Sequence, residues 1–421
     1  MPAEPRDAPG PTLPPGFLWG AATAAHQVEG DNTHSDWWAA ETAGLLPVAS
    51  GRACAHRQKF PQDLDLMAAA GLNAYRFSVE WARIQPDSDT WDDAELARYV
   101  EMVHACRERG ITPLLTLYHF SLPAWVARRG GWLWAGAVPA FAAYVRRVVL
   151  AVGDAVDLYA TVNEPVVLAL QAYLHGAWPP LRRSLGAALA VSVRLTGAHK
   201  AAYAAIRTAR PDARVGCAKH VLHFRALSPG RLGDTLMAAA MGRVFNEVWL
   251  DAVSGGLDWI GVNYYTTMYC AAGAGRGFLL PALVRSRERP QTEIGWEVHP
   301  EGLRRVLGSL ARFGRPIYIT ENGIATLEDA RRLRFLHRHL LSATRAIADG
   351  VDVRGYFHWS LMDNYEWAEG YGMHFGLIGV ERRTLERDVR PSLGYLGAMA
   401  QRNAVLPLPV PGPAYAEEGG R

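Results

Sequence analysis

The order of apolar and polar positions along the chain predicts short strands that alternate with helices. Apolar and β-branched residues gather into short runs, and amphipathic stretches with helical spacing lie between these runs. The predicted strands are at about 17–23, 74–80, 112–119, 158–164, 213–220, 257–265, 316–322 and 355–361.

Two of the intervening stretches illustrate the helical pattern. One runs from Ala330 to Asp349 and stops at Gly350, a residue type that suits the end of a helix. In the other, apolar residues recur at spacings of three and four. They are Phe141, Tyr144, Val145, Val148 and Val149.

Eight apolar strands separated by helices predict a parallel sheet that is covered on both faces. Eight units favour a closed (β/α)₈ barrel, since an open doubly wound sheet usually has fewer strands. On pattern alone, the open sheet with a bound cofactor remains the alternative. Its glycine-rich candidate is Gly273, Gly275 and Gly277, which opens no clear helix and lacks the full dinucleotide-binding spacing, so we interpret it as a mobile loop.

The chain shows no repeat beyond this alternation and no domain linker, so we expect residues 1–421 to form a single domain. Residues 1–14 are interpreted as an N-terminal extension. Residues 404–421, rich in proline and small residues, are interpreted as a terminal tail.

Nearly every predicted strand ends in a polar or aromatic residue, which is unusual for the inside of a barrel. In barrel enzymes the carboxyl ends of the strands form the rim that carries the active site. Any one of these residues has a plainer reading, such as a core histidine or a structural ion pair, but their gathering at one rim favours a site. The candidates are Gln27, Arg76, His119, Asn163, Glu164, Asn263, Tyr265, Glu321, Trp359, Glu366 and Trp367.

The two glutamates at strand ends, Glu164 and Glu321, are the candidate catalytic groups. Hydrolysis of a glycosidic bond needs two carboxyl groups, one as proton donor and one as nucleophile or base. Arg76 and Tyr265 are suited to hold a carboxylate ionised, which would lower its pKa. The other carboxyl must stay protonated, so we expect a less polar pocket to raise its pKa.

The remaining candidates match what a sugar presents. Gln27, His119, Asn263 and Glu366 can hydrogen-bond ring hydroxyl groups, and the apolar face of a pyranose stacks on an indole such as Trp359 or Trp367. Asn163, immediately before Glu164, is positioned to bond the sugar 2-hydroxyl.

Composition excludes several other classes of function. The net charge of +3 is small for 421 residues and gives no sign of nucleic acid or an anionic membrane as a partner. The first 16 residues lack the apolar core of a signal peptide and no 18-residue apolar run occurs, so a soluble cytoplasmic protein is expected. Its four cysteines are far apart, so we expect buried free thiols and no metal site. They are Cys54, Cys106, Cys217 and Cys270.

From about residue 17 to residue 400, the chain resembles glycoside hydrolase family 1, the β-glucosidase family. The motifs that carry the resemblance, in order, are FLWGAATAAHQVEG at 17–30, NAYRFSVEWARI at 73–84, TLYHFSLPAW at 116–125, TVNEP at 161–165, IGVNYY at 260–265, GWEVHPEGL at 295–303, YITENG at 318–323 and HWSLMDNYEW at 358–367.

The resemblance implies a retaining (β/α)₈ enzyme that acts on small β-glycosides without metal or cofactor. It implies that Glu164 is the acid/base and Glu321 the nucleophile, with the two carboxyl groups roughly 5 Å apart. Arg76 would then lie below the nucleophile and Trp359 would form the platform. The sugar-binding positions it implies are Gln27, His119, Asn163, Asn263, Tyr265, Glu366 and Trp367.

The chain departs from the family pattern around the predicted leaving-group site. Phe120-Ser121 replaces the usual Trp-Asp, and the stretches after Glu321 and between about 221 and 257 look short. We therefore expect an open apolar entrance that favours bulky hydrophobic aglycones. The aromatic residues expected there are Phe120, Trp132, Trp134 and Trp178.

Three other functions remain to be weighed. A 6-phospho-β-glycosidase needs a cationic grip on phosphate, and Glu366 would repel that group. A catalytically inactive sugar-binding barrel would be expected to have lost one of the two carboxylates. Transglycosylation shares the same covalent intermediate and is left open, as are the oligomeric state and the choice among glucose, galactose and fucose.

Overall fold

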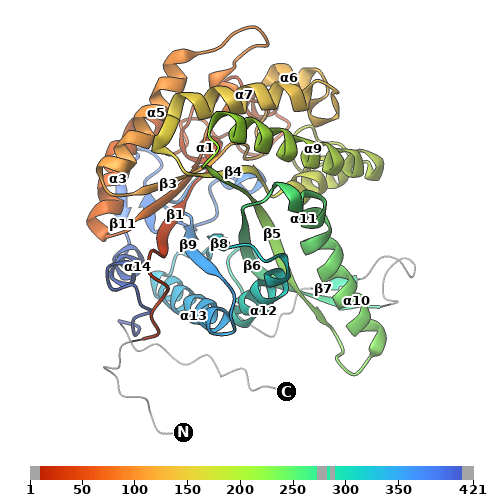
Figure 1. Cartoon of the computed structure of the whole chain (residues 1–421), viewed down its shortest axis with the longest axis vertical. Helices are drawn as coiled ribbons and strands as arrows, with labels where there is room; N and C mark the ends of the chain where they lie inside the picture. Colours follow the sequence, from red (N-terminus) through yellow and green to blue (C-terminus); the bar gives the residue numbers. More distant parts are fainter. Residues whose placement is uncertain (1–9, 273–281, 285–289, 410–421) are drawn as a thin grey trace.

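Eight parallel strands close into a barrel at the centre of the molecule (Figure 1). The structure is a computed structural model that describes residues 10–272, 282–284 and 290–409. Neighbouring strands follow the order β1, β2, β3, β4, β5, β6, β8 and β9, and β9 pairs with β1 to close the cylinder. The predicted (β/α)₈ barrel is confirmed and the open doubly wound sheet is wrong. The strands are β1 (Leu18–Ala22), β2 (Ala74–Ser78), β3 (Thr112–Thr116), β4 (Leu158–Asn163), β5 (Arg214–Ala226), β6 (Trp259–Ala271), β8 (Ile317–Asn322) and β9 (Val353–Trp359).

Helices surround the barrel and cover the outer face of the sheet (Figure 1). The longer ones are α3 (His56–Ala70), α5 (Asp93–Glu108), α7 (Ala137–Val152), α9 (Leu185–Ala209), α10 (Leu232–Gly242), α12 (Pro300–Leu310), α13 (Asp329–Ala348) and α14 (Pro391–Arg402). Shorter helices are α1 (Ala25–Val28), α2 (Asp36–Thr42), α4 (Trp81–Ile84), α6 (Ala124–Arg128), α8 (Pro165–Leu168) and α11 (Val248–Val253). Short 3₁₀ helices are η1 (Gly131–Leu133), η2 (Gly153–Ala155), η5 (Ser254–Gly256), η6 (Ala311–Phe313) and η7 (Trp367–Glu369), and two π-helical segments are η3 (Ala169–His175) and η4 (Arg243–Glu247).

The two helices singled out in the sequence are present at the expected places. The five apolar residues of α7 that the spacing singled out are fully buried, as predicted. Helix α13 ends one residue earlier than predicted, and Gly350 follows it with φ +92°. A side chain at that position would be strained, so glycine is required where the chain turns out of the helix.

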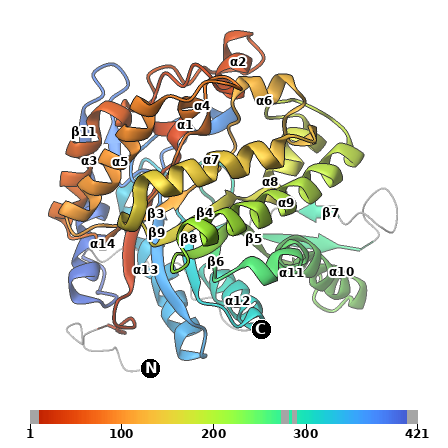
Figure 2. The ribbon, with the colours of Figure 1, turned by 45° about the horizontal axis from the view of Figure 1, so that its top comes forward.

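Strands β5 and β6 extend well beyond the predicted ends at residues 220 and 265. Their pairing continues past the barrel as a ribbon, from His223 opposite Thr267 to Ala226 opposite Cys270. β7 (Ala282–Val284) adds an antiparallel strand to β6, and α10 packs against the ribbon (Figure 2). The prediction stopped too early because this ribbon is only partly buried, so it lacks the continuous apolar pattern of a barrel strand.

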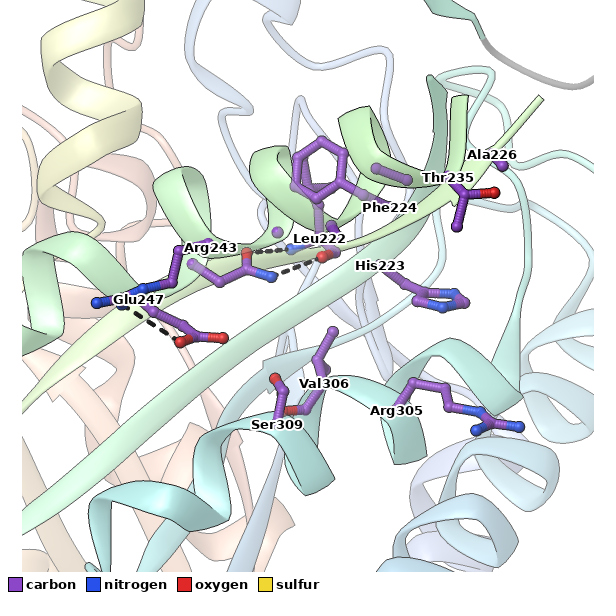
Figure 3. Close-up of a pocket in the computed structure, with 14 residues that line it drawn as sticks. Leu222, His223, Phe224, Ala226, Thr235, Arg243, Glu247, Arg305, Val306 and Ser309 are labelled. Atoms are coloured by element: carbon purple, nitrogen blue, oxygen red, sulfur yellow. Dashed lines mark hydrogen bonds and ion pairs between the residues drawn. The ribbon is translucent and has the colours of Figure 1, made fainter. Parts of the chain in front are cut away.

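A cavity of about 410 Å³ lies on the outer side of this ribbon, between α10, η4 and α12 (Figure 3). Leu222, Phe224 and Val306 are among the apolar residues that line it. His223 and Arg305 lie along the same wall (Figure 3). None of the residues predicted for the sugar site lines this cavity.

The ends of the described chain meet beneath the barrel. Thr12 bridges Ala404, and the Trp19 indole nitrogen donates to Asn403 at 2.9 Å. A two-stranded hairpin of β10 (Ile378–Val380) and β11 (Arg387–Val389) precedes α14. Residues 1–9 and 410–421, parts of the predicted extension and tail, lie outside the described residues, as do Gly273, Gly275 and Gly277.

All four cysteines are buried and unpaired, as predicted. Among the helices that the structure describes, none is both long and apolar enough to cross a bilayer.

Candidate active site

The strand register brings the two predicted catalytic glutamates to one rim of the barrel. Asn263 on β6 pairs with Glu321 on β8, and on its other side Asn263 pairs with His220 on β5. Glu164 directly follows β4, the next strand around the barrel. Because parallel strands end at the same edge, these side chains converge although they are far apart in the sequence.

Glu321 is held by two short hydrogen bonds. Arg76 Nη1 donates to its Oε1 atom at 2.5 Å, and the Tyr265 hydroxyl donates to its Oε2 atom at 2.6 Å. All three side chains are almost completely buried. The predicted support of this carboxyl group by Arg76 and Tyr265 is therefore present in the geometry.

Glu164 is held mainly through one oxygen atom. Its Oε1 atom accepts from Asn263 Nδ2 at 2.7 Å and lies 3.3 Å from Nδ1 of His220. Its backbone has φ +44°, in the left-handed region that residues other than glycine rarely adopt. Such conformations persist at functional sites because the surrounding structure fixes them.

A buried amide network joins the two carboxyl groups. Arg76 Nη2 donates to Asn163 Oδ1 at 2.7 Å, and Asn263 Nδ2 donates to the same atom at 3.1 Å. Asn263 also binds Glu164, and Arg76 also binds Glu321. Hence Asn163, Asn263 and Arg76 fix the position of one glutamate relative to the other.

Among the predicted site residues, two buried polar atoms have no hydrogen-bond partner in the described part of the chain: Gln27 Oε1 and His119 Nδ1. Burial lowers the pKa of His119 well below its usual value, so the ring is neutral. Its Nε2 atom accepts from Asn163 Nδ2 at 3.1 Å, which leaves the proton on Nδ1. One free acceptor and one free donor, both buried, are what a hydroxyl-bearing ligand would satisfy.

Glu366 lies beside Gln27. The Gln27 side-chain nitrogen donates to Glu366 Oε2 at 3.2 Å and to the carbonyl oxygen of Tyr365 at 2.8 Å. Burial raises the pKa of Glu366 to about 8, and the negative charge of Glu321 adds to this effect. Glu366 is therefore protonated at neutral pH and can donate as well as accept a hydrogen bond.

Aromatic rings form one wall of the site. The His119 ring stacks on Trp359 at 5.8 Å and on Trp367 at 6.1 Å between ring centres. Trp178 lies 4.8 Å from Phe120 and 5.7 Å from Trp367. The predicted tryptophans Trp359 and Trp367 are thus together with His119.

Two of the four aromatic residues expected at the entrance are elsewhere, and that part of the prediction is wrong. Trp132 is fully buried against Tyr118 and Phe141, beneath the surface of the molecule. Trp134 packs edge-on against Trp125. Nearness in sequence misled the prediction, because the turn around 130–134 folds away from the site, whereas Phe120 and Trp178 remain beside Trp367.

Comparison with known proteins agrees with this arrangement. The sequence model of glycosyl hydrolase family 1 matches residues 10–256 and 238–405. The chain belongs to glycosyl hydrolase family 1. The resemblance read from the motifs is confirmed, and with it the class of enzyme, an O-glycosyl hydrolase.

Relatives align along nearly the whole chain. A β-glucosidase of Agrobacterium sp. is 35% identical over 440 residues, covering 92% of this chain and 95% of the relative. The solved β-glycosidase from Pyrococcus horikoshii is 37% identical, with a TM-score of 0.89 over 94% of this chain and 97% of its own. The family 1 β-glucosidase from Thermotoga maritima is 30% identical, with a TM-score of 0.88 over 94% and 100%.

The pKa values of the two glutamates in this family 1 site are shifted in directions opposite to those expected from the sequence. Burial raises the pKa of Glu321 to about 7, and the negative charge of Glu164 adds to it, although Arg76 and Tyr265 oppose the shift. Burial also acts to raise the pKa of Glu164, but the His220 imidazole and the Lys219 ammonium lower it further than burial raises it. We expected a lowered pKa for Glu321 and a raised one for Glu164, and this was wrong.

The pKa of Glu164 was predicted in the wrong direction because the sequence analysis did not include the residues at the end of strand β5 among the site candidates. Lys219 and His220 end the predicted run at 213–220 just as other polar residues end the other strands. Lys219 is fully buried, and burial lowers its pKa to about 7. The signal that singled out the other rim residues was therefore present at β5 as well.

The arrangement can hold a small polyhydroxylated ligand between two carboxyl groups and a wall of rings. The two carboxyl groups titrate as a pair, because both are buried and the negative charge of Glu164 raises the pKa of Glu321. Within the described residues, no group of three or more His, Cys, Asp or Glu side chains is placed to hold a metal ion.

Proposed function

We propose that this chain is a retaining β-glucosidase that releases terminal non-reducing β-D-glycosyl residues by double displacement. The observation that carries the proposal is the pair of buried carboxyl groups, Glu164 and Glu321, tied together by Asn163, Asn263 and Arg76. Two such groups at one rim supply the acid and the nucleophile that a retaining mechanism needs.

In the first step, Glu321 acts as the nucleophile. The pair holds one proton, and the reaction starts from the form in which this proton is on Glu164 and Glu321 is ionised. The Glu321 carboxylate attacks the anomeric carbon, the bond to the leaving oxygen breaks, and the proton of Glu164 passes to that oxygen. A covalent glycosyl–Glu321 ester and a free alcohol result. Arg76 and Tyr265 orient the attacking carboxylate through both of its oxygen atoms.

In the second step, Glu164 acts as a base. Its carboxylate accepts a proton from water, the water oxygen attacks the anomeric carbon, and Glu321 leaves as a carboxylate. Two inversions give net retention. An alcohol in place of water would give transglycosylation by the same step.

The sugar is held by the side chains around the pair. Gln27 Oε1 accepts from one sugar hydroxyl, and His119 Nδ1 donates to another, which satisfies both buried atoms. Asn163 contacts the 2-hydroxyl, and Trp359 stacks on the apolar face of the ring. Glu366, protonated at neutral pH, both donates to and accepts from hydroxyl groups at the far end of the sugar.

The names of relatives support a hexose as the glycone and leave its epimer open. The solved Thermotoga maritima β-glucosidase is described in complexes with glucoimidazole and with galacto-hydroximolactam. A relative from Pyrococcus woesei, 29% identical, is a β-galactosidase. We propose glucose as the main glycone of this chain, with galactose and fucose as alternatives that direct assay distinguishes.

For the leaving group, we propose a preference for bulky hydrophobic aglycones. Phe120 and Trp178 support this, because their rings lie 4.8 Å apart beside Trp367 and provide apolar contact. The variant Trp178→Ala should lower kcat/KM for a steryl or flavonoid glucoside about tenfold and for cellobiose less than about threefold. A wild-type preference for cellobiose would contradict the proposal.

The rival functions are less well supported. A phosphorylated sugar needs a cation at its 6-position, and the polar partners of Glu366 in the described chain are Gln27 and Trp359. An inactive sugar-binding barrel has no need of the Arg76 and Tyr265 contacts to a buried Glu321.

Assays with nitrophenyl β-glycosides of glucose, galactose and fucose test the proposed function. Glu321→Gln should lose on the order of 10⁴-fold in kcat on the best substrate. Glu328→Gln makes the same chemical change at an exposed position seven residues away and should keep wild-type activity. A loss of less than about tenfold in Glu321→Gln would contradict the assigned nucleophile.

A further inference from the structure

His220 contacts Glu164 directly and also contacts Tyr265, which is a hydrogen-bond partner of Glu321. Its Nδ1 atom lies 3.3 Å from Glu164 Oε1, and its ring stacks on Tyr265 with centres 6.0 Å apart and planes inclined by 20°. Tyr265 in turn donates to Glu321. Because carboxylate oxygen only accepts, His220 donates its Nδ1 proton to ionised Glu164.

The hydrogen bonds of Glu164 differ between its two oxygen atoms. Oε1 receives Asn263 at 2.7 Å and His220 at 3.3 Å. In the described part of the chain, Oε2 receives no hydrogen bond from protein. Both hydrogen bonds therefore fix Glu164 through its Oε1 atom. Its Oε2 atom is available to carry the proton that the leaving group needs.

We propose that His220 is a positioning residue of the hydrolytic reaction, which acts through Glu164 by fixing its Oε1 atom and so presenting Oε2 to the leaving oxygen. This inference rests on the proposed function, since it requires Glu164 to be the acid/base.

The position of His220 is itself well defined. The strand register sets it beside Asn263, the other donor to Glu164. Lys219 Nζ donates to the carbonyl oxygen of His220 at 2.5 Å, and the Phe245 ring meets the imidazole edge-on at 6.0 Å. The His220 side chain is thus fixed by the strand register, by the contact to its carbonyl oxygen and by the rings packed against it. It therefore has little freedom to move and can orient the Glu164 carboxyl group.

His220 also affects the charge of Glu164, because its electrostatic attraction and its hydrogen bond both lower the pKa of that carboxyl group. Removing the imidazole therefore raises the pKa of Glu164, and the alkaline limb of the pH profile moves to higher pH. The other titratable or charged groups that act on Glu164 or its partners are Lys219 on β5, Arg76 on β2, His119 after β3, Tyr265 on β6, Glu321 on β8 and Glu366 after β9.

The test compares His220→Ala with His220→Asn on two substrates. An alkyl β-glucoside needs its leaving oxygen protonated, whereas a 2,4-dinitrophenyl β-glucoside does not. His220→Ala should lower the plateau of kcat/KM, its pH-independent maximum, about fivefold for the alkyl glucoside, which is the size expected for one lost hydrogen bond. For the dinitrophenyl glucoside the plateau should fall less than about twofold. His220→Asn, whose amide nitrogen replaces Nδ1, should restore the plateau.

The pH profile separates positioning from charge. Both variants lack the imidazole that lowers the pKa of Glu164 by electrostatic attraction, so the alkaline limb for the alkyl glucoside should move to higher pH in both. His223→Asn makes the same change three residues along β5, where the side chain lines the outer cavity, and should match wild type (Figure 3). Melting temperatures of all variants, measured beforehand, establish that each is folded.

The inference is overturned if His220→Ala leaves the alkyl plateau unchanged or lowers it equally for both substrates. It is also overturned if His220→Asn behaves as His220→Ala does, or if the alkaline limb stays in place. Failure of the proposed function gives a different result, because wild-type protein would then hydrolyse neither β-glucoside.

Discussion

At the scale of single residues, Glu164 and Glu321 differ through their neighbours. Glu321 binds one cation and one hydroxyl group, while Glu164 binds an amide and an imidazole. Burial acts on both carboxyl groups, yet it raises the pKa of Glu321 to about 7 while that of Glu164 falls below its usual value. The two carboxyl groups therefore titrate as a pair that holds one proton, and their proposed roles rest on the contacts of their oxygen atoms instead of on the order of the two pKa values.

The proton held by the pair predicts the alkaline limb of activity. In the proposed mechanism one carboxyl group must keep a proton for the leaving group, so kcat/KM should fall as pH rises above about 7, where Glu321 loses the last proton of the pair. Tyr265→Phe removes a hydrogen bond that favours the carboxylate, so the limb should move to higher pH. A pH profile of kcat/KM with a nitrophenyl glucoside measures both.

A neighbouring tyrosine provides the control. The Tyr264 hydroxyl donates to the carbonyl oxygen of His299 instead of to a catalytic carboxylate. Tyr264→Phe should therefore leave the alkaline limb where it is. An unchanged limb in Tyr265→Phe, or an equal shift in both variants, would contradict the assigned role of Tyr265.

Most residues of the site could be predicted because polar side chains at strand ends conflict with a packed barrel. Arg76, Asn163, Asn263, Tyr265 and Glu321 were found in this way, and all of them meet in the structure. What the sequence could not supply was which neighbour contacts which oxygen, and those contacts decide the pKa values. The order of the two pKa values therefore came only from the structure.

At the scale of elements, three residues with positive φ lie where strands and turns meet the site. They are Phe120 (φ +72°), Glu164 (φ +44°) and Trp367 (φ +49°). Each costs on the order of 1–3 kcal/mol unless its surroundings compensate, so rigid elements must hold the rim. Another rigid connection between elements is a buried ion pair between α3 and β11, in which Arg387 contacts both oxygen atoms of Asp63 at 2.7 Å.

Breaking that ion pair predicts a large loss of stability. Both side chains are almost completely buried, so Arg387→Met leaves a buried carboxylate without its cation and should lower the free energy of unfolding by about 3–5 kcal/mol. Arg354→Met breaks an exposed pair with Asp352 and should cost less than about 1 kcal/mol. Urea denaturation measures both, and equal losses would contradict the account.

The same ion pair gives a pH dependence of stability. Burial acts to raise the pKa of Asp63, but hydrogen bonds from Arg387 and His56 lower it below 3.8. A lowered pKa in the folded state means that this stabilisation is present above pH 3.8 and is lost as pH falls below it. The loss with falling pH should be smaller in Arg387→Met than in wild type.

At this scale the prediction from sequence succeeded inside the barrel and failed outside it. Strands β2, β4 and β8 begin and end within about two residues of the predicted runs, because burial on both faces gives a continuous apolar pattern. The ribbon that extends β5 and β6 is partly exposed and carries mixed residues, so no pattern marked it. Its stability comes from packing with α10 and β7.

At the scale of the whole molecule, closure of the barrel is what turns scattered residues into a site. Gln27 follows the first strand and Glu366 follows the last, yet their side chains lie 3.2 Å apart because β9 pairs with β1. An open sheet would leave these two strands at opposite edges. The proposed sugar subsite therefore requires the closed cylinder, which is why the alternation of strands and helices was the decisive feature of the sequence.

The central claim is that Glu321 forms a covalent bond to the sugar. A 2-deoxy-2-fluoro-β-glucoside with a dinitrophenyl leaving group should form this ester and hydrolyse it slowly, because the fluorine destabilises both transition states. Mass spectrometry of the intact protein should show the added sugar, and peptide mapping should locate it on Glu321. Attachment to any other residue, or turnover of β-glucosides without any covalent adduct, would contradict the account.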